Sequence, residues 1–152
     1  AWPSMTSVSV CSSTWAFKSL AGIDASELTT SQRTNAYAKN ANSYETRNAV
    51  AITKNGKMAS GENIDVIRGL DWQESIIVTD VYSLLINNPK IAFTDAGVAN
   101  VESVLRAALS RGVQQGVLAA DPEFTVTVPK VADVSTNDKA NRNLPDVTFA
   151  AN

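Results

Sequence analysis

The sequence predicts an α+β fold, a two-layer sandwich in which a mixed sheet has two main helices on one side. Short runs with strand-like alternation occur towards both ends of the chain. Two long stretches between them, residues 71–87 and 95–115, have the composition and spacing of helices. At 152 residues, the chain is long enough for one domain with a core of its own. We therefore expect a single α/β domain over residues 1–152.

The first third of the chain predicts a strand, a helix and a hairpin. Residues 14–23, TWAFKSLAGI, alternate large apolar residues with smaller or polar ones and predict a strand. Residues 28–44 open with Thr and Ser residues suited to capping, and they predict a polar helix over residues 30–42. In residues 50–59, two strand-like runs flank Asn55 and Gly56. This pair is preferred in a type I′ hairpin turn because both residues tolerate positive φ.

The middle of the chain predicts the two main helices. We expect strand-like character before Gly69 and a helix from about Asp71, which Pro89 stops. Thr94 is placed to cap the second helix, with Asp95 in its first turn. Helical spacing puts five residues on one apolar stripe facing the sheet: Val98, Val101, Leu105, Ala108 and Gly112.

The last third predicts two strands and a short helix. Residues 124–128, FTVTV, alternate cleanly and end at Pro129, which predicts an edge strand. Residues 136–142 predict a short helix, and residues 146–151 a final strand. The chain has no initiator Met, and it stops inside this last run. We therefore expect it to be a portion of a longer protein.

Composition argues against several classes of function. The net charge is −2 and the basic residues are spread singly, which argues against nucleic-acid binding. No apolar run reaches the roughly 18 residues needed for a bilayer span, so we expect no membrane insertion. The chain has no histidine, and Cys11 is its only cysteine. These facts remove histidine-based catalysis, an internal disulfide and a cysteine-rich metal site.

Residues 60–72, SGENIDVIRGLDW, carry the densest group of charges. Glu62, Asp65, Arg68 and Asp71 could form an acid–base cluster, but they fit better as the solvated surface of a helix or subunit contact. Asp71 and Glu74, three positions apart, could hold a divalent cation. Acidic residues are also favoured at a helix start by its dipole, which is the better explanation. We therefore predict no catalytic, cofactor-binding or metal-binding residues, and no cofactor.

Two further features concern assembly. Residues 72–86 carry apolar side chains nearly all round the predicted helix, which indicates burial by the rest of the domain or by a neighbouring chain. Residues 6–10 and 146–151 are strand-like and poor in charge, and such edges invite pairing with another chain.

Three long blocks follow one another along the chain: GENIDVIRGLDW, NNPKIAFTDAGV and LAADPEFTVTVPKVADVSTNDKANRNLPDVTF. In this order they resemble a bacteriophage protein family identified with contractile-tail sheath proteins. TWAFKSLAGI and LTTSQRTNAYAKNANSY also fit the family pattern, so the resemblance spans nearly the whole chain. These blocks carry no chemistry of their own.

The resemblance implies a structural subunit and no enzyme. It implies self-assembly in rings around a tail tube, contacts with the tube, baseplate and tail terminator proteins, and location in the virion tail after synthesis in the host cytoplasm. The chain would be the inner, C-terminal-side portion of a longer sheath protein. The alternatives are another tail or baseplate component and, less favoured, a metal-dependent hydrolase using Asp65, Asp71 and Glu74.

Overall fold

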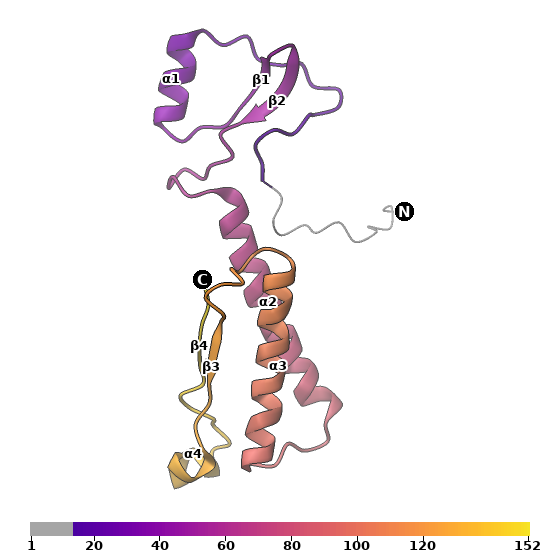
Figure 1. Cartoon of the computed structure of the whole chain (residues 1–152), viewed down its shortest axis with the longest axis vertical. Coiled ribbons are helices and arrows are strands. Elements are labelled where there is room, and N and C mark those ends of the chain that lie inside the picture. The colour runs from indigo at the N-terminus through magenta and orange to yellow at the C-terminus, as the bar shows by residue number, and fades with distance from the viewer. Residues whose placement is uncertain (1–13) are drawn as a thin grey trace. The chain divides into compact units, whose positions relative to one another are not determined.

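The computed structural model describes residues 14–152. Within this range the chain has an α+β fold with two main helices, which confirms the predicted class (Figure 1). It divides into two compact units: unit 1 extends to Leu70, and unit 2 is Asp71–Asn152. The elements are α1 (Thr30–Ala38), β1 (Ser43–Arg47), β2 (Val50–Lys54), α2 (Ile64–Asn87), α3 (Asp95–Gln114), β3 (Thr125–Thr127), a 3-10 helix (Val131–Asp133), α4 (Thr136–Ala140) and β4 (Thr148–Ala150).

The strands form two separate antiparallel pairs, whereas the sequence predicted a mixed sheet. In unit 1, β1 pairs with β2 so that Ser43 lies opposite Lys54. In unit 2, β3 pairs with β4 so that Val126 lies opposite Phe149. Each strand finds its partner within its own unit, and β1 and β2 are joined by a turn too short for parallel pairing.

The unit 1 hairpin turns at a different place from the predicted one. Asn48 and Ala49 form its tip, with φ values of 47° and 64°, as a type I′ turn requires. The prediction of a hairpin turn at Asn55 and Gly56 was wrong, although both residues have positive φ. Residues 43–47 give β2 a five-residue partner, whereas the chain after Gly56 makes a single bridge from Lys57. The longer ladder satisfies more backbone groups.

Residues 14–23 do not form the predicted strand. Phe17 has φ 62°, in the left-handed region, and this interrupts the extended backbone. The segment still covers the outer edge of β2. The Phe17 N–H donates to the Thr53 carbonyl at 2.8 Å, and the Thr53 N–H donates to the Lys18 carbonyl at 2.8 Å. Two backbone hydrogen bonds therefore replace a regular third strand.

The helix predicted over residues 30–42 is present but ends earlier, at Ala38. A capping box fixes its start. The Thr29 hydroxyl accepts from the Gln32 N–H, and the Gln32 side chain accepts from the Thr29 N–H. Asn40, with φ 56°, turns the chain away from the helix axis before β1.

Helix α2 begins at Ile64, about seven residues before the predicted start. The strand-like character expected before Gly69 was wrong, because Gly69 lies inside the helix. A glycine costs a helix only about 1 kcal/mol relative to alanine. Buried Ile64 secures the first turn, with its N–H donating to the Gly56 carbonyl at 3.0 Å. The end at Asn87, before Pro89, agrees with the prediction.

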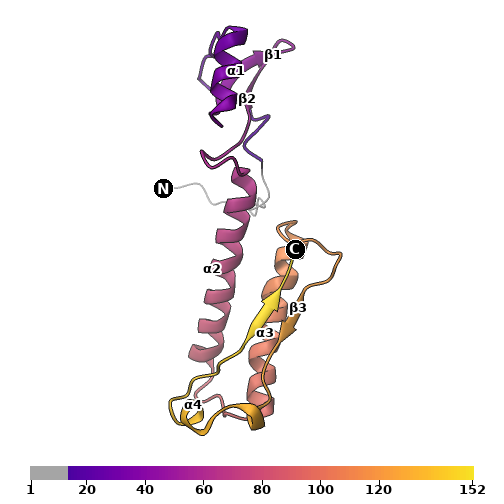
Figure 2. The same ribbon diagram turned by 90° about the vertical axis from the view of Figure 1, so that its left-hand side faces the viewer.

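Helix α3 supplies the centre of the unit 2 core. Thr94 caps it by accepting from the Gly97 N–H, and the predicted apolar stripe is mostly buried. Leu105 and Leu109 pack with Val126 of β3, and partly buried side chains of α2 complete the cluster. Figure 1 shows the β3–β4 pair beside α3. Figure 2 shows the C-terminal half of α2 running along α3.

The remaining predicted elements of unit 2 are confirmed, each shorter than expected. The strand predicted over 124–128 is β3, and the one predicted over 146–151 is β4. The short helix predicted over 136–142 is α4, which Ser135 caps by accepting from the Asp138 N–H.

Candidate assembly surface

The charged residues of the segment 60–72 lie on the approach to α2 and on its first turns. Glu62 and Arg68 are exposed, and Asp65 accepts a hydrogen bond from the N–H of Val66 at 3.0 Å. Asp71 and Glu74 are exposed on the same helix. Within residues 14–152, no group of three or more candidate ligands could hold a metal ion. The structure therefore places these charges on a solvated helix surface, and the absence of a catalytic or metal site stays a prediction.

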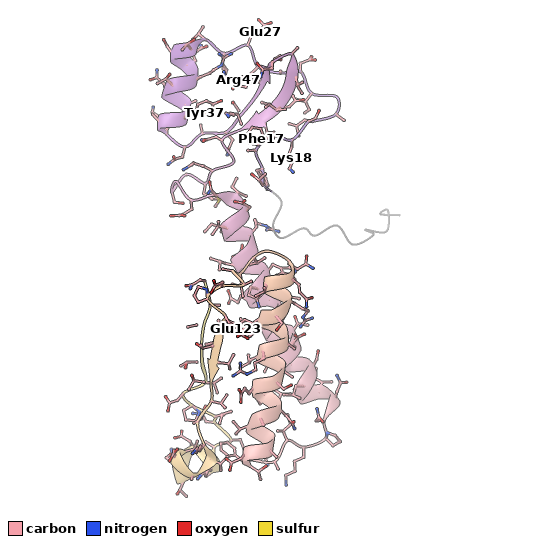
Figure 3. All side chains as sticks on the ribbon, in the orientation of Figure 1. Phe17, Lys18, Glu27, Tyr37, Arg47 and Glu123 are labelled. Atoms are coloured by element: carbon pink, nitrogen blue, oxygen red, sulfur yellow. The ribbon has the colours of Figure 1, made fainter. Side chains whose placement is uncertain are left out.

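A buried carboxylate, which the sequence analysis missed, joins the elements of unit 1. The Glu45 side chain on β1 is fully buried. One of its oxygens accepts from Arg33 Nε of α1 at 2.7 Å. The other accepts from Arg47 Nε at 2.7 Å and from the Tyr37 hydroxyl at 3.0 Å. Figure 3 shows the side chains of Tyr37 and Arg47 between α1 and β1.

This cluster keeps Glu45 ionised. Burial raises the pKa of the Glu45 carboxyl, but the hydrogen bonds from Arg47 and Tyr37 and the charges of Arg47 and Arg33 lower it more. Its pKa therefore lies below the ordinary value. The same contact raises the pKa of Arg47. A signal was present in the sequence, since Glu45 and Arg47 are two apart and so share one face of a strand.

Helix α2 presents an exposed apolar surface in unit 2. Ile77 and Val81 pack against the core. On the other side, four apolar side chains are 48–77% exposed, and we call them the α2 outer face: Val78, Tyr82, Leu85 and Ile86. The sequence left open whether this helix is buried by its own domain or by a neighbour. Within the described residues only one side of it is covered. Contiguous exposed apolar surface of this kind is typical of interaction sites.

The β3–β4 pair offers open strand edges. In this two-stranded sheet, each strand is paired on one side only within the described residues. Phe149 of β4 is 49% exposed. Of the two segments predicted to exchange strands, 146–151 contains β4, whereas 6–10 lies outside the described residues. Unpaired N–H and C=O groups on an exposed edge can accept a strand from another chain.

No helix in the described part of the chain has both the length and the apolar character to cross a membrane. An exposed apolar helix face and an open strand edge are each typical of surfaces that bind other chains.

One known family matches the part of the chain that contains the two main helices. Residues 64–122 match the family model described as E217 tail sheath protein gp31-like, C-terminal domain. The matched range covers α2 and α3 and ends shortly before β3. No curated protein matches the chain. The match supports the bacteriophage tail sheath family that the sequence blocks resembled.

Proposed function

We propose that the protein is a structural subunit of a phage contractile tail sheath, which assembles with copies of itself in rings around the tail tube. The observation that carries the proposal is the family match, because its range includes the whole of α2, the helix that bears the α2 outer face. The matched model is that of a C-terminal domain, which supports placing the chain in the inner, C-terminal-side part of a longer sheath protein.

Two kinds of contact would hold such an array together. The α2 outer face would bury its apolar side chains against a neighbouring subunit. Strand addition at residues 146–151, or at 6–10, would pair an extended segment with an open edge. Each contact is weak alone, but several per subunit make a stable tube. The tail tube, baseplate and tail terminator proteins would be the other partners, and the subunit would be made in the host cytoplasm before joining the virion tail.

The proposal is tested by electron microscopy of the protein expressed at full length. We expect helical tubes. Truncation before Asp146, or deletion of residues 1–12, should prevent them if strand addition joins the subunits. If both truncated forms polymerise normally, strand exchange is excluded and a contact through the α2 outer face becomes the better explanation.

That helix contact has its own variant. Tyr82→Asp with Ile86→Asp places two charges on the α2 outer face, at side chains 60% and 77% exposed, so the fold should survive. Asn100→Asp with Ser103→Asp, both exposed on α3, is the matched control. Tubes in the control but not in the α2 variant would support the interface. If the unchanged protein forms only capped discs or single rings, the alternative of a baseplate or other tail component gains support.

A further inference from the structure

Unit 2 contains a groove of about 830 Å³ whose lining is apolar and basic. Its walls come from the end of α2, the connection to α3, the first turns of α3 and the end of α4 with the residues that follow. The apolar lining includes Leu85, Ile91, Phe93, Val98 and Leu144. Leu85 also belongs to the α2 outer face, so the groove and that face are continuous. We call this feature the α2–α4 groove.

Every charged residue that lines the groove is a cation: Lys90, Lys139 and Arg142. None of the three has an acidic partner among the described residues. Four arginines elsewhere in the described residues do have an acidic partner: Arg33 and Arg47 pair with Glu45, Arg106 pairs with Glu102, and Arg111 pairs with Asp80. An apolar groove with three uncompensated positive charges, in a protein of net charge −2, selects a ligand that is both apolar and acidic.

We propose that the α2–α4 groove binds the acidic, apolar segment at residues 20–28 of a second copy of this chain. The proposal rests on the sheath function proposed above, which brings many copies side by side. The segment reads LAGIDASEL and carries Asp24 and Glu27. No cation occurs between Lys18 and Arg33, so its negative charge is uncompensated in the sequence.

The backbone of this segment is held by Tyr44 of β1, which bonds Leu20 and Ser26, but most of its side chains are exposed. It has no helix or strand, and Leu20 and Ile23 are 40% and 57% exposed. Figure 3 shows Glu27 on the loop before α1, directed away from β1 and β2. Another acid-rich stretch, residues 121–123, is less free because Phe124, next to it, packs against the unit 2 core. The acids of residues 71–80 lie within helix α2, so that stretch is not an extended segment. Residues 20–28 can therefore offer apolar side chains to the groove walls and carboxylates to its cations.

The direct test measures binding of a fluorescein-labelled peptide of residues 19–29 to the whole chain by fluorescence anisotropy. We expect saturable binding that weakens as salt is added. Replacing Asp24 by Asn and Glu27 by Gln in the peptide should weaken binding about fivefold, since each exposed ion pair contributes at most about 1 kcal/mol. The chain variant Lys139→Gln with Arg142→Gln should show the same loss. Lys130→Gln, an exposed cation outside the groove, is the control and should bind normally.

A charge exchange tests the contact between whole chains. One variant carries Asp24→Lys and Glu27→Lys, and the other Lys139→Glu and Arg142→Glu. In sedimentation velocity, each alone should associate less than the unchanged chain, and an equimolar mixture should regain association. Circular dichroism of each variant checks its folding. If one fails to fold, the two peptides measured on the unchanged chain still decide the question.

The outcomes separate this contact from the sheath function. If the peptide of residues 19–29 does not bind, the groove proposal is overturned, even where the protein forms tubes. The same holds if this peptide and its form with Asp24→Asn and Glu27→Gln bind equally well. A mixture that associates no better than its components also overturns it. Charge-dependent peptide binding by a protein that forms no tubes would support the contact and overturn the sheath function. Both results together would support a self-association site between the α2–α4 groove and residues 20–28.

Discussion

Replacing Leu109 by Ala should destabilise unit 2 by about 3 kcal/mol. Leu109 is fully buried in α3 and packs with Leu105 and Val126. The loss of three buried carbon atoms costs about 2.4 kcal/mol at roughly 0.8 kcal/mol for each. A residual cavity of roughly 50 Å³ adds about 1.2 kcal/mol. Several neighbours in the cluster are only partly buried, so they can move into some of that cavity. This relaxation lowers the summed cost of the substitution to about 3 kcal/mol.

A loss of this size is large for the unit concerned. Unit 2 extends from Asp71 to Asn152, and a domain of that length is stable by about 4–12 kcal/mol. Urea unfolding of the whole chain, followed by circular dichroism and by hydrogen exchange of the α3 amides, measures the change. Leu85→Ala is the matched control, because Leu85 is 55% exposed. It should change stability by less than about 1 kcal/mol.

The comparison of the two leucines decides whether the core is assigned correctly. A loss at Leu109 within about 1 kcal/mol of that at Leu85 would refute the assignment of the α3 core face. Leu105→Ala should cost roughly 2–5 kcal/mol by the same reasoning, since Leu105 is 5% exposed. A value near zero there would show that α3 packs through another face.

Three further predictions concern the hairpin, its buried carboxylate and the α2–α3 contact. Ala49→Gly should stabilise unit 1 by about 0.5–1 kcal/mol, because φ 64° strains alanine but not glycine, whereas Ala51→Gly inside β2 should destabilise it; thermal unfolding checks both. The lowered pKa of Glu45 means that its stabilisation is complete above the ordinary glutamate pKa and is lost as the pH falls through the lowered value. Protection of the β1 and β2 amides against hydrogen exchange, measured relative to the intrinsic exchange rate at each pH, should therefore fall in acid. In Glu45→Gln this protection should be lower at neutral pH and nearly independent of pH in that range. Gln73→Met should stabilise unit 2 by about 1 kcal/mol in urea unfolding, because it removes the buried Gln73 Oε1, which has no hydrogen-bond partner among residues 14–152. The change also removes the hydrogen bond that Gln73 Nε2 donates to the Ala108 carbonyl at 3.1 Å, so a lower stability would show that this bond outweighs the unpaired oxygen.

Local chemistry was enough to predict the parts of the fold that are set by neighbours in the sequence. The Thr94 cap, the stop of α2 before Pro89 and the apolar stripe of α3 each depend on residues within a few positions of one another. The short strand β3 followed from alternation, and β4 from a strand-like run after Pro145. The exclusion of histidine chemistry follows from composition, because no fold can supply a residue type that the chain lacks.

Tertiary structure decided which of several locally acceptable pairings formed. Asn55 and Gly56 have the right residues for a hairpin turn, yet the turn forms at Asn48 and Ala49, because β1 offers β2 a longer ladder. Gly69 alone would favour a break in the helix. Helix α2 nevertheless begins at Ile64 and continues past Gly69, because burial of Ile64 stabilises its first turn. The Glu45 cluster needs Arg33, twelve positions away, to come close in space. The exposure of the α2 outer face was likewise beyond the sequence, since apolar side chains all round a helix do not reveal which side the rest of the chain will cover.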